Sequence, residues 1–385
     1  MPRPFVRLAI VMPLAHQEGG AEQLLRLLLR ESAKAAHPPL GLLVAFLAEG
    51  PMADEAVALG FPTRVIRAGR LREVSGYART VRFLRGWIKE TRPDAVLSWM
   101  AKGHLYVSPA AGWMGIPRLW YQHGIPSDGW LDRAVAALPS EGVMVCSRNA
   151  ETAQQRLAPR RATRVVYPAV EASQRPISRE VARHELGLTA EWSVVLLVSR
   201  LERWKGVHVA ISAAAEVLAR YPKTLFVHAG GRHSLDPACA DGLHDLASSL
   251  GDHWRFLGHV PPEALATWYR AADVFVHSNA GPEPFGMAVV EAMAAGLPVV
   301  VSALGGPAEI VTDGVDGILV PPGDASALAR AVSDLLGDPA ARARLGSAAL
   351  MRAAAFSADT YPDRLRDALA ALVCSARAEG ERPCP

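Results

Sequence analysis

The sequence is poor in cysteine, and its four cysteines, Cys146, Cys239, Cys374 and Cys384, form no C-x-x-C pair. Their scatter argues against a structural zinc site or a disulfide framework, and it favours a reducing, cytoplasmic compartment. Long apolar runs are absent too, because no stretch approaches the roughly 18 residues that a membrane-spanning helix needs. The apolar start resembles a signal peptide, but Pro13 interrupts it and no small-residue cleavage site follows. We therefore expect a buried first strand in a soluble protein.

Neither sign of charge dominates the chain. The 41 basic and 38 acidic side chains leave a net charge of +3, which is too small to indicate a nucleic-acid partner. Hydrophobic residues make up 50% and charged residues 21%, a composition typical of globular proteins. The 385 residues are enough for two domains, each with its own core.

Apolar runs of strand length alternate with helical patterns almost throughout the chain. Most of these runs are continuous rather than alternating, as in a parallel sheet that helices cover on both faces. The resulting βαβα order predicts an α/β fold with doubly wound sheets. The predicted strands are 6–12, 40–47, 63–67, 95–99, 118–122, 143–147, 164–168, 193–199, 224–231, 254–260, 273–278, 298–302 and 316–320, with helices that include 21–36, 75–90 and 361–380.

The segment 167–180 interrupts this alternation with two prolines and polar residues, which indicates an interdomain linker. We therefore expect two Rossmann-like domains, over 1–170 and 171–357. Ligands of such sheets bind outside the carboxyl ends of the strands. If the two sheets face one another, a cleft between these ends is the expected binding site.

The motif "SRLERWKG", residues 199–206, follows the first predicted strand of the second domain. Arg200 and Lys205 stand there just before a helix, an arrangement suited to clamping a diphosphate. The alternative is a solvated helix N-terminus. Cations at that position oppose the helix dipole, however, so an anionic ligand explains them better.

The stretch "HSNAGPEPFGMAVVEAMAAGLP", residues 277–298, combines the end of a strand, a Pro/Gly loop and a helix that Gly296 ends. Glu283 lies in the loop and Glu291 about two turns along the helix. Glu283 could serve the helix dipole, and Glu291 could lie on the surface. The helix is apolar nearly all round, however, so Glu291 is expected to be interior and to need a partner, such as a vicinal diol of a ligand.

Three weaker signals also follow predicted strands. Gly19 and Gly20 open a helix after the first strand, where backbone N–H groups favour an anion, although no G-x-G-x-x-G fingerprint is present. Gly305 and Gly306 form a similar strand-to-helix turn, which is expected to offer free backbone N–H groups. His123 follows a strand of the first domain. A lone histidine is usually structural, but this position at the carboxyl end of a strand makes His123 a candidate functional residue.

The motifs "SRLERWKG", "PEPFGMAVVEAMAAGLPVV", "GGPAEIVTDGVDGILVPPGD" and "GGAE" together resemble retaining glycosyltransferase family 4, also described as glycosyl transferases group 1, which has the GT-B fold. The resemblance spans the chain and is strongest over 193–337. The stretches "LSWMAKGHLY" and "WYQHGIPSDGW" are similar to members associated with exopolysaccharide or lipopolysaccharide assembly. One departure is "YPAV", 167–170, where many members have an Asn-Gly turn.

The resemblance implies a site for a nucleotide diphosphate sugar. Glu283 would contact the sugar hydroxyls, and Glu291 the ribose. Arg200 and Lys205 would bind the diphosphate. Backbone amides near Phe285, Gly286 and Met287 would contact the sugar or the phosphates, and His259 and Val260 would line the base. From the first domain, Gly19 and Gly20 would approach the donor, and His123 would lie beside the reacting carbon. The helix 358–376 would pack back on the first domain, which leaves a flexible tail at 377–385.

We expect the enzyme to transfer a hexose with retention, with the cations and helix amides stabilising the leaving diphosphate. No cofactor beyond the nucleotide sugar and no metal is implied, because no Asp-x-Asp or His/Asp cluster is evident. A 2-epimerase would need further acids and histidines, and a phosphorylase a lysine-bound pyridoxal phosphate. The alternative that is not an enzyme is a catalytically silent sugar-binding protein. A donor-hydrolysis assay would distinguish it from a glycosyltransferase. The nucleotide, the sugar and the acceptor stay open.

The segment 64–92 holds nine basic side chains against Glu73 and Glu90, a local net charge of +7. Helical spacing predicts two stripes: a core stripe of Tyr77, Val81, Leu84 and Ile88, and a basic stripe of Arg82, Arg85, Lys89 and Arg92. A solvated face is one interpretation. The other is contact with anionic headgroups or a lipid-linked hydroxyl acceptor, which would make the protein peripheral at the inner face of the membrane.

Overall fold

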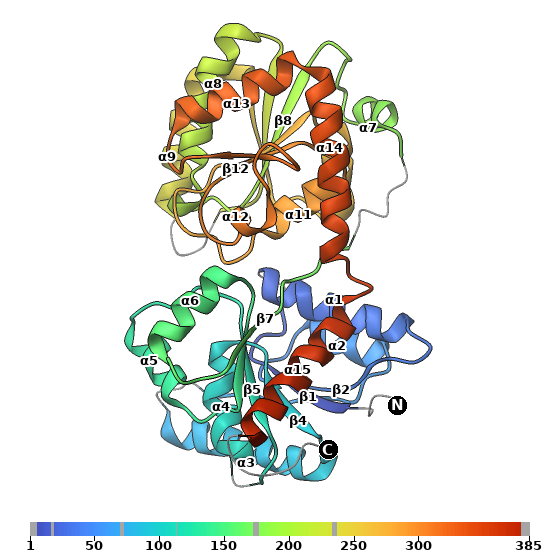
Figure 1. The fold of residues 1–385 in the computed structure, drawn as a ribbon, viewed down its shortest axis with the longest axis vertical. Helices are drawn as coiled ribbons and strands as arrows, with labels where there is room; N and C mark the ends of the chain where they lie inside the picture. The colour runs from blue at the N-terminus through green and yellow to red at the C-terminus, as the bar shows by residue number, and fades with distance from the viewer. Residues whose placement is uncertain are drawn as a thin grey trace. The chain divides into compact units, whose positions relative to one another are not determined.

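The computed structural model describes residues 6–16, 19–69, 73–112, 114–171, 177–232 and 237–378. The chain divides into two compact units (Figure 1). Unit 1 comprises Met1–Ala169 and Ala358–Pro385, and unit 2 comprises Val170–Ser357. Parts of the predicted linker (172–176) and of the predicted tail (379–385) lie outside the described residues.

Unit 1 is built on a seven-stranded sheet in which every strand pair is parallel. The strand order is β3-β2-β1-β4-β5-β6-β7, so the direction of winding reverses between β1 and β4. Its strands are β1 (Val6–Met12), β2 (Leu40–Phe46), β3 (Thr63–Val65), β4 (Ala95–Ser98), β5 (Arg118–Gln122), β6 (Gly142–Val145) and β7 (Thr163–Val165).

Helices connect these strands and cover the sheet of unit 1. They are α1 (Gly20–Lys34), α2 (Pro51–Ala58), α3 (Val74–Thr91), α4 (Ala101–Ala111), α5 (Trp130–Ala137), α6 (Arg148–Leu157) and, from the far end of the chain, α15 (Tyr361–Ala378). Tyr361, Leu365, Leu369 and Leu372 recur at helical spacing in α15 and are buried in unit 1. Leu372 of α15 packs tightly against β6, since a Cβ on Gly142 would lie 2.7 Å from the Leu372 Cδ2 atom.

Unit 2 repeats the architecture with a six-stranded parallel sheet, in the order β10-β9-β8-β11-β12-β13. The winding reverses between β8 and β11. The strands are β8 (Ser193–Val198), β9 (Thr224–Ala229), β10 (Trp254–Gly258), β11 (Val274–His277), β12 (Val299–Ser302) and β13 (Ile318–Val320). The prediction of two doubly wound parallel α/β domains is thus confirmed.

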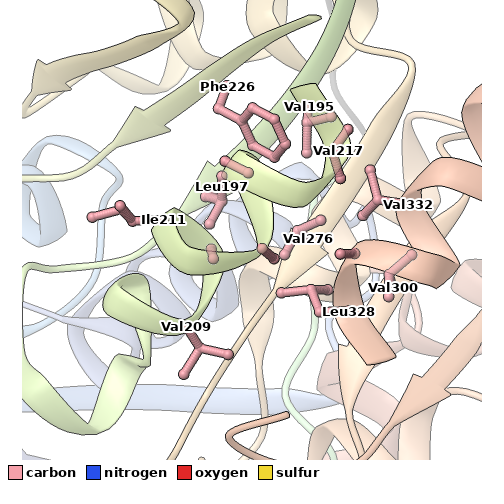
Figure 2. Packing of buried hydrophobic residues seen from close by; sticks show 14 of the residues in the cluster. Val195, Leu197, Val209, Ile211, Val217, Phe226, Val276, Val300, Leu328 and Val332 are labelled. Atoms are coloured by element: carbon pink, nitrogen blue, oxygen red, sulfur yellow. The ribbon is translucent and has the colours of Figure 1, made fainter. Parts of the chain in front are cut away.

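The core of unit 2 is made chiefly of valine, leucine and alanine (Figure 2). Val195 of β8 and Val300 of β12 are fully buried there, beside side chains of the helices that flank the sheet. The helical elements are α7 (Arg179–Glu185), η1 (Arg203–Lys205), α8 (Val207–Arg220), α9 (Pro237–Ala247), η2 (Ser248–His253), α10 (Pro262–Ala271), α11 (Met287–Ala294), α12 (Pro307–Ile310), α13 (Ala325–Gly337), α14 (Pro339–Ala353) and η3 (Ala354–Phe356).

The cysteines and the apolar helices bear on what the composition indicated. Cys146 and Cys239 are free thiols. Within the described residues, no helix has the length and apolar character to cross a membrane.

Candidate functional site

The loops after β8 and β11 meet at the point where the sheet of unit 2 reverses its winding, where ligands of doubly wound sheets bind. The loop after β8 carries Lys205 on the short helix η1, and Gly206, with a φ of 67°, is the N-cap of α8. A Cβ on Gly206 would lie 1.9 Å from the backbone oxygen of Ser278, which follows β11. A glycine is therefore needed for the two loops to touch.

This approach brings Lys205 and Glu283 together, although 78 residues separate them in the chain. The Lys205 ammonium pairs with Oε2 of Glu283, and the two side chains are only 12% and 14% exposed. Burial alone would raise the pKa of Glu283. The charge of Lys205, together with the neighbouring His277, overcomes this effect and holds the pKa well below its usual range. Glu283 is thus a buried carboxylate that is ionised near pH 7.

A glycine turn braces the loop that carries Glu283. The Gly306 N–H donates a hydrogen bond to the backbone oxygen of Glu283 at 2.8 Å. Gly305, with a φ of 69°, forms a bridge with the same residue. The expectation that Gly305 and Gly306 offer free backbone N–H groups is therefore wrong, because the Gly306 donor is used within the protein.

Arg200 stands at the outer side of the same loop. Its guanidinium lies 2.9 Å from Glu202 Oε1, and its side chain is 47% exposed. Glu202 also accepts a hydrogen bond from the Trp204 indole, whose ring lies 4.1 Å beneath the Lys205 ammonium. Arg200 and Lys205 thus belong to one short loop, with the first cation accessible and the second buried.

Glu291 lies on α11, half-buried rather than fully interior. The Tyr269 hydroxyl of α10 donates a hydrogen bond to its Oε2 at 2.9 Å. The expected need of Glu291 for a partner is thus met in part by the chain itself. Its predicted contact with a ribose stays a prediction.

The other residues predicted in unit 2 also follow strands. Phe285 is buried against Phe356, with ring centroids 5.6 Å apart. Gly286 precedes α11 with a φ of 100°, and Met287 is the first residue of that helix. His259 and Val260 follow β10; His259 is exposed and Val260 is half-buried.

In unit 1, Gly19 and Gly20 are exposed at the start of α1. His123 follows β5 and packs against Tyr121 and Trp99, with ring centroids 4.0 Å and 5.1 Å away. Its Nε2 is buried and makes no hydrogen bond within the described part of the chain. Burial lowers the pKa of His123 to about 3, so the ring is neutral near pH 7. The roles predicted for these three residues stay predictions.

The structure adds His277, Asn279 and Tyr269 to the site. Asn279 donates a hydrogen bond to Glu283 Oε2 at 2.8 Å, and the His277 Nε2 lies 3.8 Å from the same oxygen. Polar residues at the carboxyl end of a predicted strand were the available signal for His277 and Asn279. Nothing local in the sequence marks Tyr269, because its contact with Glu291 depends on how α10 packs.

Within the described residues, no group of three or more His, Cys, Asp or Glu side chains is placed to hold a metal ion. The expectation of transfer without a metal is not tested by this observation.

Residues 178–352, which include every predicted site residue of unit 2, match the family model described as Glycosyl transferases group 1. D-inositol 3-phosphate glycosyltransferase 2 of Catenulispora acidiphila is 37% identical over 217 residues, which cover 52% of this chain and 51% of that protein. The corresponding enzyme of Streptosporangium roseum is 36% identical over 218 residues, covering 55% and 50%. This chain thus spans about half the length of the curated relatives it matches.

Among solved structures, HepE of Anabaena in complex with UDP and glucose aligns with a TM-score of 0.81 at 24% identity, covering 94% of this chain and 99% of that one. At this identity the likeness shows the fold, and it confirms the expected GT-B architecture of two Rossmann-like domains. Together with the family match over unit 2, the comparisons support the glycosyl transferases group 1 family.

Proposed function

We propose that this protein is a retaining glycosyltransferase that moves a hexose from a nucleotide diphosphate sugar to a hydroxyl acceptor. The buried Lys205–Glu283 pair at the switch point of unit 2 is the observation that carries the proposal. Breaking such a pair is strongly destabilising, and apolar residues of similar volume would often serve stability as well. A buried pair at a ligand-binding edge is therefore better explained by a role in binding a polar ligand.

The proposed chemistry assigns each group a separate task. Arg200 and Lys205, with the first N–H groups of α8, stabilise the charge that develops on the departing diphosphate. Glu283 accepts hydrogen bonds from sugar hydroxyls and stays ionised. The acceptor oxygen bonds to the anomeric carbon on the face from which the diphosphate leaves, and a leaving phosphate oxygen takes the acceptor proton. His123 acts as a neutral group beside the sugar, because its low pKa prevents it from being a cation near pH 7.

A thermal-shift screen of nucleotide sugars tests the donor, because a ligand of the native state stabilises it by about 2.7 kcal/mol at a hundred times its Kd. UDP-glucose is the first donor to test, since HepE was solved with UDP and glucose. Inositol phosphate is one acceptor to test, because the curated relatives carry it in their names. The anomeric configuration of the product, read by NMR, decides between retention and inversion.

The site assignment is tested by Glu283→Ala, which is expected to abolish transfer while the protein stays folded. A matched control is Glu191→Ala, because Glu191 pairs with Lys223 on the surface of the same unit, where both side chains are more than half exposed. Loss of transfer in the first variant alone supports the assignment. Wild-type turnover in Glu283→Ala would refute it, and a donor that binds without any turnover would favour the catalytically silent alternative.

We further propose that α3 contacts an anionic membrane surface, where a lipid-linked acceptor of polysaccharide or glycolipid assembly would be available. Arg79, Arg82, Arg85 and Lys89 are exposed on this helix, and Arg92 follows it. Arg64 and Arg67, by contrast, pair with acids, and Arg70 and Arg72 lie outside the described residues. On the same helix, Phe83 is 60% exposed among the basic side chains. An exposed aromatic residue beside several cations suits the interface of an anionic lipid layer.

Reversing the charges of Arg82, Arg85 and Lys89 to glutamate should abolish binding to vesicles of anionic lipid. The matched control reverses Arg156, Arg160 and Arg164, which are exposed elsewhere on unit 1, and changes the net charge by the same amount. Equal binding of the two triple variants would show that only net charge matters and would contradict a dedicated face.

A further inference from the structure

Three side chains converge on a single oxygen of Glu283. Lys205 pairs with Oε2, Asn279 donates to Oε2 at 2.8 Å, and the His277 Nε2 lies 3.8 Å from Oε2. None of these three contacts is made to Oε1. A carboxylate has room for about four hydrogen bonds across its two oxygens, so one oxygen is engaged by the protein while the other keeps its capacity.

His277 is deeply buried in this cluster, with a side chain only 4% exposed. Its Nδ1 is also buried and makes no hydrogen bond within the described residues. A proton on Nδ1 would therefore be a buried donor without an acceptor, whereas a proton on Nε2 points toward a carboxylate. The geometry thus favours a neutral ring with its proton on Nε2.

The charges around the ring agree with this assignment. Glu283, from the loop after β11, and Lys205, from η1, are the charged groups that face it. Burial lowers the pKa of His277, Glu283 opposes that shift and Lys205 adds to it, and the net direction is downward. The ring is therefore neutral near pH 7, and its Nε2 faces the Glu283 carboxylate at 3.8 Å without adding a second positive charge.

We propose that His277 is a positioning residue: its neutral imidazole, together with Asn279 and Lys205, holds Oε2 of Glu283 so that Oε1 is presented to a hydroxyl of the donor sugar. This inference rests on the proposed function. It differs from a structural role because it predicts an effect on the sugar and none on the nucleotide diphosphate.

The first test needs no activity. Long-range ¹H–¹⁵N NMR of the histidine rings in the full chain should show an Nε2-protonated, neutral His277 at pH 7, assigned by the loss of its signals in His277→Leu. In Glu283→Gln the His277 signals should shift, because the acceptor loses its charge. An Nδ1-protonated ring, or signals that Glu283→Gln leaves unchanged, would overturn the proposal.

The second test compares two ligands, the nucleotide diphosphate and the corresponding nucleotide sugar. His277→Leu should weaken binding of the nucleotide sugar about tenfold, as expected when a polar contact that orients a charged carboxylate is lost, and leave the nucleotide diphosphate unchanged. His277→Gln, whose amide N–H reaches a similar position, should restore most of the difference. His228→Leu is the matched control, since His228 is a fully buried, neutral strand histidine of the same unit. It should not separate the two ligands.

The outcomes distinguish this proposal from the proposed function. If no nucleotide sugar binds the wild-type protein, the proposed function fails, while the NMR test still decides the coupling of His277 to Glu283. If the nucleotide sugar binds but His277→Leu weakens both ligands equally, the positioning role fails and the proposed function stands.

Discussion

Replacing Lys205 with methionine removes the charge that keeps Glu283 ionised while it retains most of the side-chain volume. Both partners are largely buried, at 12% and 14% exposure. Removing one member of a buried ion pair typically costs 3–5 kcal/mol, because the other charge stays buried without compensation. For a unit of this size, that loss corresponds to a fall of about 10 °C in the Tm of unit 2 near pH 7.

The pH dependence of this loss has a defined sign. In the wild type the pKa of Glu283 lies below its unfolded value, so its contribution is present above pH 4.5, the ordinary value, and falls only as the pH drops further. In Lys205→Met, burial dominates and raises the folded pKa above the unfolded one. The variant should therefore regain stability as the pH falls from 7 toward 4.5, where Glu283 takes up a proton.

Thermal unfolding of the full chain, followed by calorimetry from pH 4.5 to 8, measures both effects. Lys223→Met is the matched control, because Lys223 forms a similar pair with Glu191 but is 63% exposed. Exposed pairs contribute little, so the control should hardly change the Tm at any pH. Equal losses in the two variants, or a Lys205→Met deficit that does not shrink at low pH, would refute the account of a buried pair.

Two further outcomes follow from the described geometry. Gly206→Ala should disrupt the Lys205–Glu283 contact and abolish transfer, because the new Cβ would lie 1.9 Å from the Ser278 oxygen. The control Gly314→Ala has a similar φ of 70° but open space around it, so it should cost only about 1–2 kcal/mol of backbone strain and keep activity. Equal effects of the two variants on activity and Tm would contradict the steric reasoning. Burial lowers the pKa of His104 and of His123 to about 3, so unit 1 should be most stable above pH 6.5. As the pH falls from 6.5 toward 3, each ring should reduce the free energy of unfolding by up to about 1.4 kcal/mol per pH unit. A Tm that stays constant between pH 6.5 and 4.5 would argue against neutral buried rings.

The pattern of apolar runs placed Arg200, Lys205 and Glu283 after strands, where the structure has them, but it did not indicate their partners within the chain. Lys205 and Glu283 were assigned to two parts of one ligand, and the structure shows that they also pair with each other. Glu291 was expected to need a partner, and the Tyr269 hydroxyl supplies one that the sequence did not indicate. Such contacts depend on which loops and helices become neighbours, and local periodicity does not encode that.

The sequence by itself determined the α/β class, the parallel sheets and the strand ends at which the motifs stand, because continuous apolar runs and glycine-rich turns act locally. The tertiary structure alone decided that β8 lies beside β11, and hence that a lysine and a glutamate 78 residues apart share a buried contact. It also decided that Gly306 braces Glu283 and that His277 faces it. Strand order in a doubly wound sheet differs from chain order, so these contacts arise only when the sheet is assembled.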